Sequence, residues 1–406
     1  MSATLTPNSS PSLASISFSG RGGEFFRLLL KGSLLQIPTF GFYRFWLITR
    51  MRRHLWANTS LSGERFEYTG TGKELLIGFL IALAILTPVY LLYFMAGLWA
   101  ESVQALASIP FVLVMYVLAH FGAYRARKYR ATRTTFRGIR FWVTGSGWGY
   151  AMRAISCDFA NIVTLGLALP WTSAFLERYR MRRTYFGTLQ GEFVGTGWEL
   201  FKRGWWLWAL AVFGPGLLTA PIVLLASGME NEGLIVLSAA AVCYLVVPVL
   251  LYPAFQSVLT RWRIEGALFG SVGLRSRLTT GALYGTFLKL IGSSLGLLAL
   301  VSIAVVLLYL PVAGSEEAYR QFLVDLITGE IGAIGIIVAT ALAYLALLLA
   351  FGIIQRYFMA RGLWAVIAGS ISVSNVAALD QAVAAGQPAS SLGEGLADAL
   401  DFGGGV

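Results

Sequence analysis

The sequence predicts an all-α polytopic membrane protein with six transmembrane helices arranged in three hairpins. Its mean hydropathy is +0.69. Only 13% of the 406 residues are charged, whereas a soluble domain carries about 25%. Long apolar runs also come in closely spaced pairs, and each run is near the length that crosses a bilayer. The six expected spans are residues 75–99, 105–122, 204–226, 234–255, 283–312 and 331–354.

An internal repeat groups these spans. Segment 37–75 recurs at 162–200 with a constant offset of 125, and twelve of its 39 positions are identical. Each copy is followed by one pair of apolar runs, which predicts tandem repeats. The tail after the last span is rich in Gly, Ala and Ser and is acidic, so we expect it to be disordered. The predicted organisation is a polar N-terminal tail (1–19), repeat 1 (20–122), repeat 2 (123–258), a degenerate repeat 3 (259–375) and a disordered C-terminal tail (376–406).

Two segments ahead of the spans are apolar but broken. Pro38 and Gly41 interrupt the first, and Gly166 and Pro170 interrupt the second. Each half is too short to cross a bilayer alone. We therefore expect interfacial or re-entrant helices, and paired breaks of this kind mark binding sites in many transporters.

Five short basic and aromatic segments recur between the apolar runs. Each ends in a β-branched or aromatic stretch followed by a Gly-containing turn, which predicts a helix end and then a small two-stranded hairpin. Because an isolated hairpin is marginal in water, we expect the hairpins to pack together in a layer at the cytoplasmic surface. The five segments are residues 52–72, 127–147, 178–197, 261–276 and 360–375.

The charges favour one orientation. The net charge is +11, yet the three loops that join the two spans of each hairpin are acidic, and Arg320 is their only cation. If the broken segments do not cross, every basic segment lies on the other side of the membrane. The positive-inside rule then places both termini in the cytoplasm.

The basic residues are the main candidates for a site. They suit anionic lipid headgroups or a phosphorylated ligand, and they also suit the role of topology anchors. Lys289 lies at possible membrane depth, where a cation is either functional or reaches the surface along its apolar stem. The candidate ligand-binding or headgroup-binding residues are Arg52, Arg53, Arg130, Arg178, Arg182, Arg183, Arg263 and Lys289, with the broken-helix positions Pro38, Gly41, Gly166 and Pro170.

No catalytic, metal or cofactor motif stands out. The run from Gly70 to Lys73 resembles the end of a phosphate-binding loop, but Glu67 and Glu74 occupy the other required positions. Only two histidines and two cysteines are present, and neither pair has a metal-binding spacing. We therefore expect no metal, no cofactor and no enzyme, and we interpret the positive charge as lipid contact rather than nucleic-acid binding.

Two motifs resemble a known family. The stretch GEFFRLLLKGSLLQIPTFGFYRFW at 23–46 and the stretch RRHLWANTSLSGERFEYTGTG at 52–72 are similar to the YjgN family of bacterial inner-membrane proteins, which carries a domain of unknown function. The resemblance extends to about residue 375 and implies an inner-membrane location without implying a reaction.

The sequence thus favours an integral inner-membrane protein that binds or transports a small or lipidic, anionic ligand. Membrane lipids are the expected partners, together with a small-molecule ligand in the transport case. The alternative is a structural or scaffolding module that docks a cytoplasmic protein.

Overall fold

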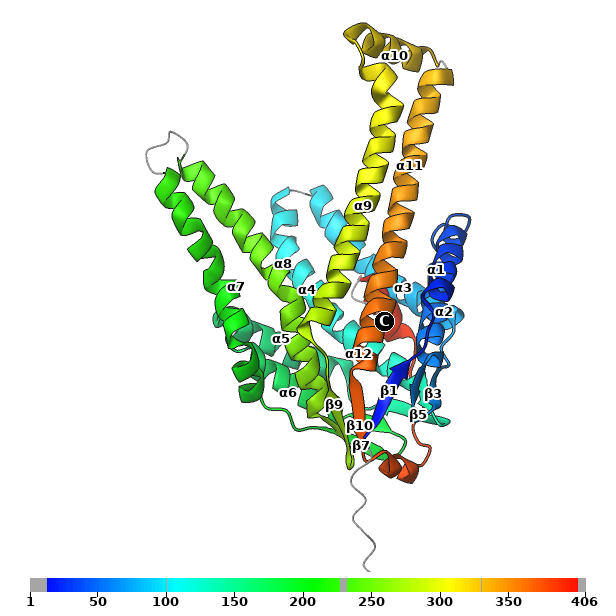
Figure 1. The fold of residues 1–406 in the computed structure, drawn as a ribbon, viewed down its shortest axis with the longest axis vertical. Helices are drawn as coiled ribbons and strands as arrows, with labels where there is room; N and C mark the ends of the chain where they lie inside the picture. The colour runs from blue at the N-terminus through cyan, green and yellow to red at the C-terminus, as the bar shows by residue number, and fades with distance from the viewer. Residues whose placement is uncertain (1–12, 100, 227–231, 330, 401–406) are drawn as a thin grey trace, which may run out of the picture.

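The computed structural model describes residues 13–99, 101–226, 232–329 and 331–400. Ten short strands form a closed antiparallel barrel at one end of the molecule, and the long helices rise from it (Figure 1). The predicted all-α class is therefore wrong. Around the barrel the strands follow the order β1-β10-β9-β8-β7-β6-β5-β4-β3-β2. Their bounds are β1 Ala14–Phe18, β2 Thr59–Leu61, β3 Glu64–Tyr68, β4 Thr134–Phe136, β5 Ile139–Val143, β6 Thr184–Phe186, β7 Leu189–Phe193, β8 Ala267–Phe269, β9 Val272–Ser276 and β10 Ile371–Ser374.

Four of the five strand pairs are tight hairpins. Each has a three-residue strand, a two-residue turn and a five-residue strand. Ser62 and Gly63 have φ of 53° and 85°, and Arg137 and Gly138 have φ of 52° and 72°. Positive φ at both turn residues is typical of the turns whose twist matches paired strands.

The fifth pair joins the two ends of the described chain. β1 pairs with β10 and with β2, and β10 pairs with β9. The predicted polar N-terminal tail therefore contains a barrel strand at Ala14–Phe18, while residues 1–12 lie outside the described part of the chain. Closing the barrel leaves no strand edge open, which is why strands of three to five residues persist.

Apolar side chains fill the barrel. Leu61, Phe136, Phe186 and Val272 come from four different strands and form one buried cluster. The short 3-10 helix η2 (Val376–Gln381) adds Leu379 to the same cluster. The barrel is thus a packed core rather than a pore.

Helical pairs connect successive barrel hairpins (Figure 1). α9 and α11 form the pair that extends furthest from the barrel, and the acidic α10 lies at their tip. The helices are α1 Gly22–Gln36, α2 Arg44–Ala57, α3 Gly72–Trp99, α4 Glu101–Thr132, α5 Gly147–Val163, α6 Leu169–Met181, α7 Gly197–Ala226, α8 Glu232–Gly266, α9 Thr280–Ala313, α10 Glu316–Thr328, α11 Ile331–Arg356, the π-helix η1 Tyr357–Gly362, α12 Leu363–Gly369 and α13 Leu392–Ala399.

Five helical stretches in the described residues are long and apolar enough to cross a membrane, one fewer than the six predicted. The predicted span 204–226 lies in α7, which is 30 residues long but does not belong to these five. The five stretches are Gly72–Leu98, Ser108–Thr132, Ile235–Gly266, Thr280–Leu310 and Ile334–Ala368.

The two broken segments are short helical hairpins. α1 has 15 residues and α2 has 14, so each is about 22 Å long, less than the ~30 Å apolar core of a bilayer. α5 and α6 repeat the arrangement with 17 and 13 residues. Gly41 and Gly166 lie in the two connecting turns with φ of 84° and 82°.

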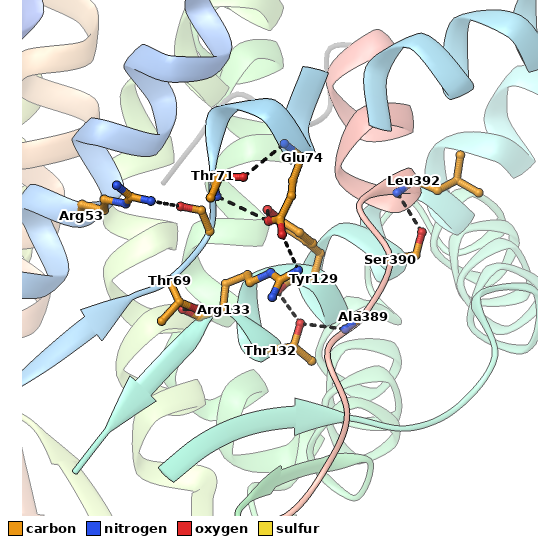
Figure 2. A network of polar contacts seen from close by, with 11 residues as sticks. Arg53, Thr69, Thr71, Glu74, Tyr129, Thr132, Arg133, Ala389, Ser390 and Leu392 are labelled. Atoms are coloured by element: carbon orange, nitrogen blue, oxygen red, sulfur yellow. Dashed lines mark hydrogen bonds and ion pairs between the residues drawn. The ribbon is translucent and has the colours of Figure 1, made fainter. Parts of the chain in front are cut away.

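The C-terminal segment differs from the disordered tail that composition predicts. After η2, residues 382–391 run without helix or strand to α13, where Leu396 and Ala397 are buried. Backbone hydrogen bonds help to hold this segment, because Ala389 N donates to Thr132 Oγ1 at 3.3 Å (Figure 2). The buried side chains of Leu396, Ala397 and Glu394 therefore dock a segment whose other residues are mostly small or polar. Residues 401–406 lie outside the described chain.

Candidate functional site: an apolar cavity and an arginine cluster

An apolar cavity of about 260 Å³ lies between the α5–α6 turn, α6, α7 and α8; we call it the open cavity. Aliphatic, aromatic, proline and glycine residues line it. They are Gly166, Leu167, Leu169, Pro170, Leu200, Phe201, Gly204, Trp205, Leu207, Trp208, Ala211, Pro248, Leu251, Tyr252, Phe255 and Val258. Apolar lining with few polar groups is typical of ligand sites.

Two local features shape this cavity. Trp208 Nε1 donates a hydrogen bond to the carbonyl of Leu165 at 2.9 Å, which holds the α5–α6 turn against α7. Gly204 leaves room on α7, because a Cβ placed there would meet only Val258, at 3.8 Å. The turn, whose break the sequence predicted, thus forms one wall of the cavity.

The arginine cluster consists of Arg52, Arg127, Arg130, Arg180 and Arg263, with Glu177 and Glu394. On one side, the Arg52 guanidinium pairs with the Glu394 carboxylate and donates to the Tyr68 hydroxyl at 3.2 Å. Arg130 approaches the second oxygen of Glu394 at 3.5 Å. The side chains of Arg52 and Glu394 are only 2% and 6% exposed, so this ion pair is withdrawn from water.

Glu177 organises the other side. Arg263 Nε lies 2.7 Å and Arg180 Nη2 lies 3.2 Å from the same Glu177 oxygen. Arg127 lies on α4 three residues before Arg130, and its side chain donates to the sulfur of Met181, the residue after Arg180, at 3.9 Å, so it connects the two sides.

The cluster is electrostatically unbalanced. Its five arginines face two carboxylates, which leaves a net charge of +3. Arg127 has no carboxylate within ion-pair distance in the described chain, and its side chain donates only to the Met181 sulfur at 3.9 Å. An excess of closely placed guanidinium groups favours binding of phosphate or carboxylate.

Arg52 is held in its charged form. Burial by itself would lower its pKa, but the Glu394 carboxylate and the Tyr68 hydroxyl raise the pKa above the usual value for arginine. A permanently charged and buried Arg52 therefore requires an anion next to it.

The structure brings together three of the eight predicted binding residues. Arg52, Arg130 and Arg263 belong to the cluster. Arg53 and Arg178 instead donate to the carbonyls of Gly70 and Gly195, at 2.7 and 3.2 Å, which ties a helix end to the turn that follows its hairpin.

The other three predicted residues lie apart from the cluster or make local contacts. The Arg183 guanidinium stacks 3.8 Å from the centre of the Tyr179 ring. Arg182 is exposed, and Lys289 is exposed on α9. Whether any of these residues binds a ligand stays a prediction.

Only two of the four predicted broken-helix positions lie at the open cavity. Gly166 and Pro170 line the open cavity, whereas Pro38 and Gly41 lie between α1 and α2 and do not border it.

The eight predicted binding residues do not include four members of the cluster: Arg127, Arg180, Glu177 and Glu394. Arg127 and Arg130, like Glu177 and Arg180, are three residues apart on one helix, which places both members of each pair on one face. This spacing was a usable signal for α4 and α6. No local signal identifies Glu394, because its partners are more than 250 residues away in the sequence.

A separate polar group lies between α4 and α5. The Tyr116 hydroxyl donates to an Asp158 oxygen at 2.6 Å, and His120 Nε2 lies 3.0 Å from the same oxygen. No three His, Cys, Asp or Glu residues of the described chain are close enough to hold a metal, and Cys157 and Cys243 are both free thiols.

Comparison with known proteins connects the chain with bacterial membrane proteins. A family model described as "Bacterial protein of unknown function (DUF898)" matches residues 14–399. The inner membrane protein YjgN is 28% identical over 124 residues in Escherichia coli K12 and 29% identical over 125 residues in Salmonella typhimurium. Each match covers 30% of this chain, and this chain spans 29% and 30% of the two relatives. No solved structure matches.

Proposed function

The chain belongs to the DUF898 family of bacterial proteins, and we propose that it binds an anionic amphiphile, a molecule with apolar chains and a phosphate or carboxylate headgroup. The apolar part would occupy the open cavity. The observation that supports the proposal is the apolar lining of that cavity beside the predicted helix break at Gly166 and Pro170.

The position of the cavity supports an apolar occupant from the membrane. Its α8 wall belongs to Ile235–Gly266, one of the five stretches long and apolar enough to span a bilayer. Several lining residues, such as Trp205 and Tyr252, are about half exposed. Acyl chains of the surrounding lipid would therefore enter the cavity laterally, from within the bilayer.

Cations lie near the cavity on the barrel side. Lys202 and Arg203 are exposed on α7, between lining residues Phe201 and Gly204. Arg263 follows the lining residue Val258 by five residues on α8, a rise of about 7.5 Å. Basic residues at the ends of membrane helices attract anionic headgroups, so a headgroup next to these cations would leave its chains at the level of the cavity.

The charge distribution supports a cytoplasmic barrel. α10, at the tip far from the barrel, contains Glu316, Glu317 and Asp325 against one cation, Arg320. The basic segments surround the barrel at the other end. By the positive-inside rule we place the barrel, and with it β1 and β10, on the cytoplasmic side of an inner-membrane protein.

Filling the cavity tests this function. Gly204→Phe places a ring in the cavity, and Gly292→Phe is a matched control on α9, where a Cβ meets no atom within 4 Å. The protein, purified in detergent, is titrated with phosphatidylglycerol, and bound lipids are counted by native mass spectrometry. We expect Gly204→Phe to lose one bound lipid and Gly292→Phe to retain it. Equal lipid counts in both variants and the unmodified chain would refute the proposal.

A second variant tests the headgroup. Lys202→Gln combined with Arg203→Gln removes two exposed cations without filling the cavity. We expect the preference for phosphatidylglycerol over phosphatidylcholine to fall several-fold. An unchanged preference would show that these cations do not contact the headgroup.

A further inference from the structure

α13 lies in a groove formed by α3, α4 and the start of α2; we call it the α13 groove. Leu396 packs in one apolar cluster with Ala82 and Leu86 of α3. Contact is closest at Gly395, where a Cβ would overlap the backbone of Gly78. Gly122 of α4 gives similar room to Leu396.

The α13 groove corresponds to the open cavity at most of its apolar positions. α3 and α7 each begin four residues after a barrel strand and are offset by 125 residues. α4 and α8 each lead into a strand, and these strands, β4 and β8, are offset by 133 residues. Five residues of α3 and α4 cluster with Leu396, and four of them correspond to residues that line the open cavity; the fifth, Phe121, corresponds to Ala254, which is buried but does not line it. The pairs are Ala82 and Leu207, Leu86 and Ala211, Met115 and Pro248, and Leu118 and Leu251.

The correspondence extends to the start of the preceding helix. With the offset of 125, Arg44 and Phe45 of α2 correspond to Leu169 and Pro170, which line the open cavity. Phe45 lies beside Glu394 and Asp398 of α13, and Arg44 pairs with Asp398 at 2.6 Å. One of two equivalent sites is therefore open and apolar, and the other contains the chain's own C-terminal helix.

α13 brings carboxylates to the cations of its groove. Glu394 contacts Arg52 and Arg130, and Asp398 contacts Arg44. Without α13 these three arginines have no other carboxylate within ion-pair distance in the described chain, and Arg52 is 1% exposed. A buried guanidinium without an anion is strongly unfavourable, so whatever replaces α13 must be anionic at this position and apolar along α3 and α4.

We propose that the α13 groove is a second site for an anionic amphiphile, with α13 occupying it in the docked state. The apolar face of α13 takes the place of the chains, and the Glu394 carboxylate takes the place of the headgroup phosphate. This inference rests on the proposed function of the open cavity.

The connection to α13 allows such an exchange. Residues 382–391 contain neither helix nor strand, and α13 has only eight residues. In this connection Ala389 N donates to Thr132 Oγ1 of α4 at 3.3 Å (Figure 2). Glu74, whose carboxylate accepts from Tyr129 and Arg133 at 2.7 and 2.8 Å, holds α3 to α4 independently of α13 (Figure 2).

The experiment uses Gly395→Leu in the full chain, which should expel α13 because no side chain fits against Gly78. Gly292→Leu on α9 is the matched control. Release of α13 is read by a glutamate-specific protease, since Glu394 is the only glutamate after Glu330. We expect cleavage after Glu394 in Gly395→Leu and protection in the control. Protection in both variants would overturn the packing on which the inference rests.

Bound phosphatidylglycerol is then counted by native mass spectrometry. One lipid on the unmodified chain and two on Gly395→Leu would support both proposals. No lipid on the unmodified chain and one on Gly395→Leu would support the second site alone. A released α13 with an unchanged count of one overturns the second site and leaves the open cavity intact. Arg44→Gln on the Gly395→Leu background should remove the gained lipid, while a lipid that persists at full affinity would exclude the headgroup role of Arg44.

Discussion

Neutralising Glu394 is the sharpest perturbation of this structure. Glu394→Gln keeps the size of the side chain but leaves Arg52 charged and without its carboxylate. Removing one partner of a buried ion pair costs about 3–5 kcal/mol. Arg52 keeps its bond to the Tyr68 hydroxyl, and Arg130 is 30% exposed and can be hydrated. We therefore expect a loss near the lower limit, about 3 kcal/mol.

The assay is unfolding in mixed micelles with increasing SDS, followed by tryptophan fluorescence. Glu316→Gln is the matched control, because its pair with Arg320 is 75–77% exposed and should contribute within ~0.5 kcal/mol. Glu394→Gln should move the midpoint far more than the control. Equal shifts would refute the reasoning that an uncompensated charge at Arg52 governs the stability of this region.

Other predictions concern the barrel and the pH dependence of stability. Phe186→Ala removes a barrel side chain that is 1% exposed and should lower the free energy of unfolding by about 3–5 kcal/mol. The control Val194→Ala, at a position 55% exposed, should change it by no more than ~0.5 kcal/mol. Similar losses of stability in SDS unfolding would argue against a packed barrel. Burial holds the pKa of His54 below its usual 6.5, with Glu24 opposing and Arg361 reinforcing the shift. His54 is therefore neutral in the folded chain at pH 7.5. Its contribution to the stability of the fold is complete above about pH 6.5, and this stability is lost as the pH falls and the folded chain must take up the proton. The unfolding midpoint should drop from pH 7.5 to pH 5, and less so in His54→Gln; an identical drop would exclude His54 as the cause.

Hydropathy predicted most of the long helices, because long apolar runs are local signals. Five of the described helical stretches are long enough to span a membrane, and the breaks at Gly41 and Gly166 do form turns between short helices. The short hairpins were also expected, since Ser62-Gly63 and Arg137-Gly138 are turn sequences with a Gly at the second position.

The barrel and the place of Glu394 in the arginine cluster could not be predicted, because they depend on contacts between distant parts of the chain. Nothing near Ala14 indicates that it pairs with Val373. Likewise, composition around Glu394 is typical of a disordered segment, and the segment docks through contacts with distant residues such as the buried guanidinium of Arg52 and the apolar side chains of α3. Arg53 and Arg178 looked equivalent to Arg52 in sequence, but helix geometry directs them to the Gly70 and Gly195 carbonyls instead.

The most direct measurement is an electron cryo-microscopy map of the full chain in phosphatidylglycerol nanodiscs. The proposed function predicts acyl-chain density between Pro170, Leu207 and Leu251, with the headgroup next to Lys202 or Arg203, while α13 fills its own groove. An open cavity occupied only by neighbouring side chains, or a headgroup on the α10 side of the membrane, would contradict it.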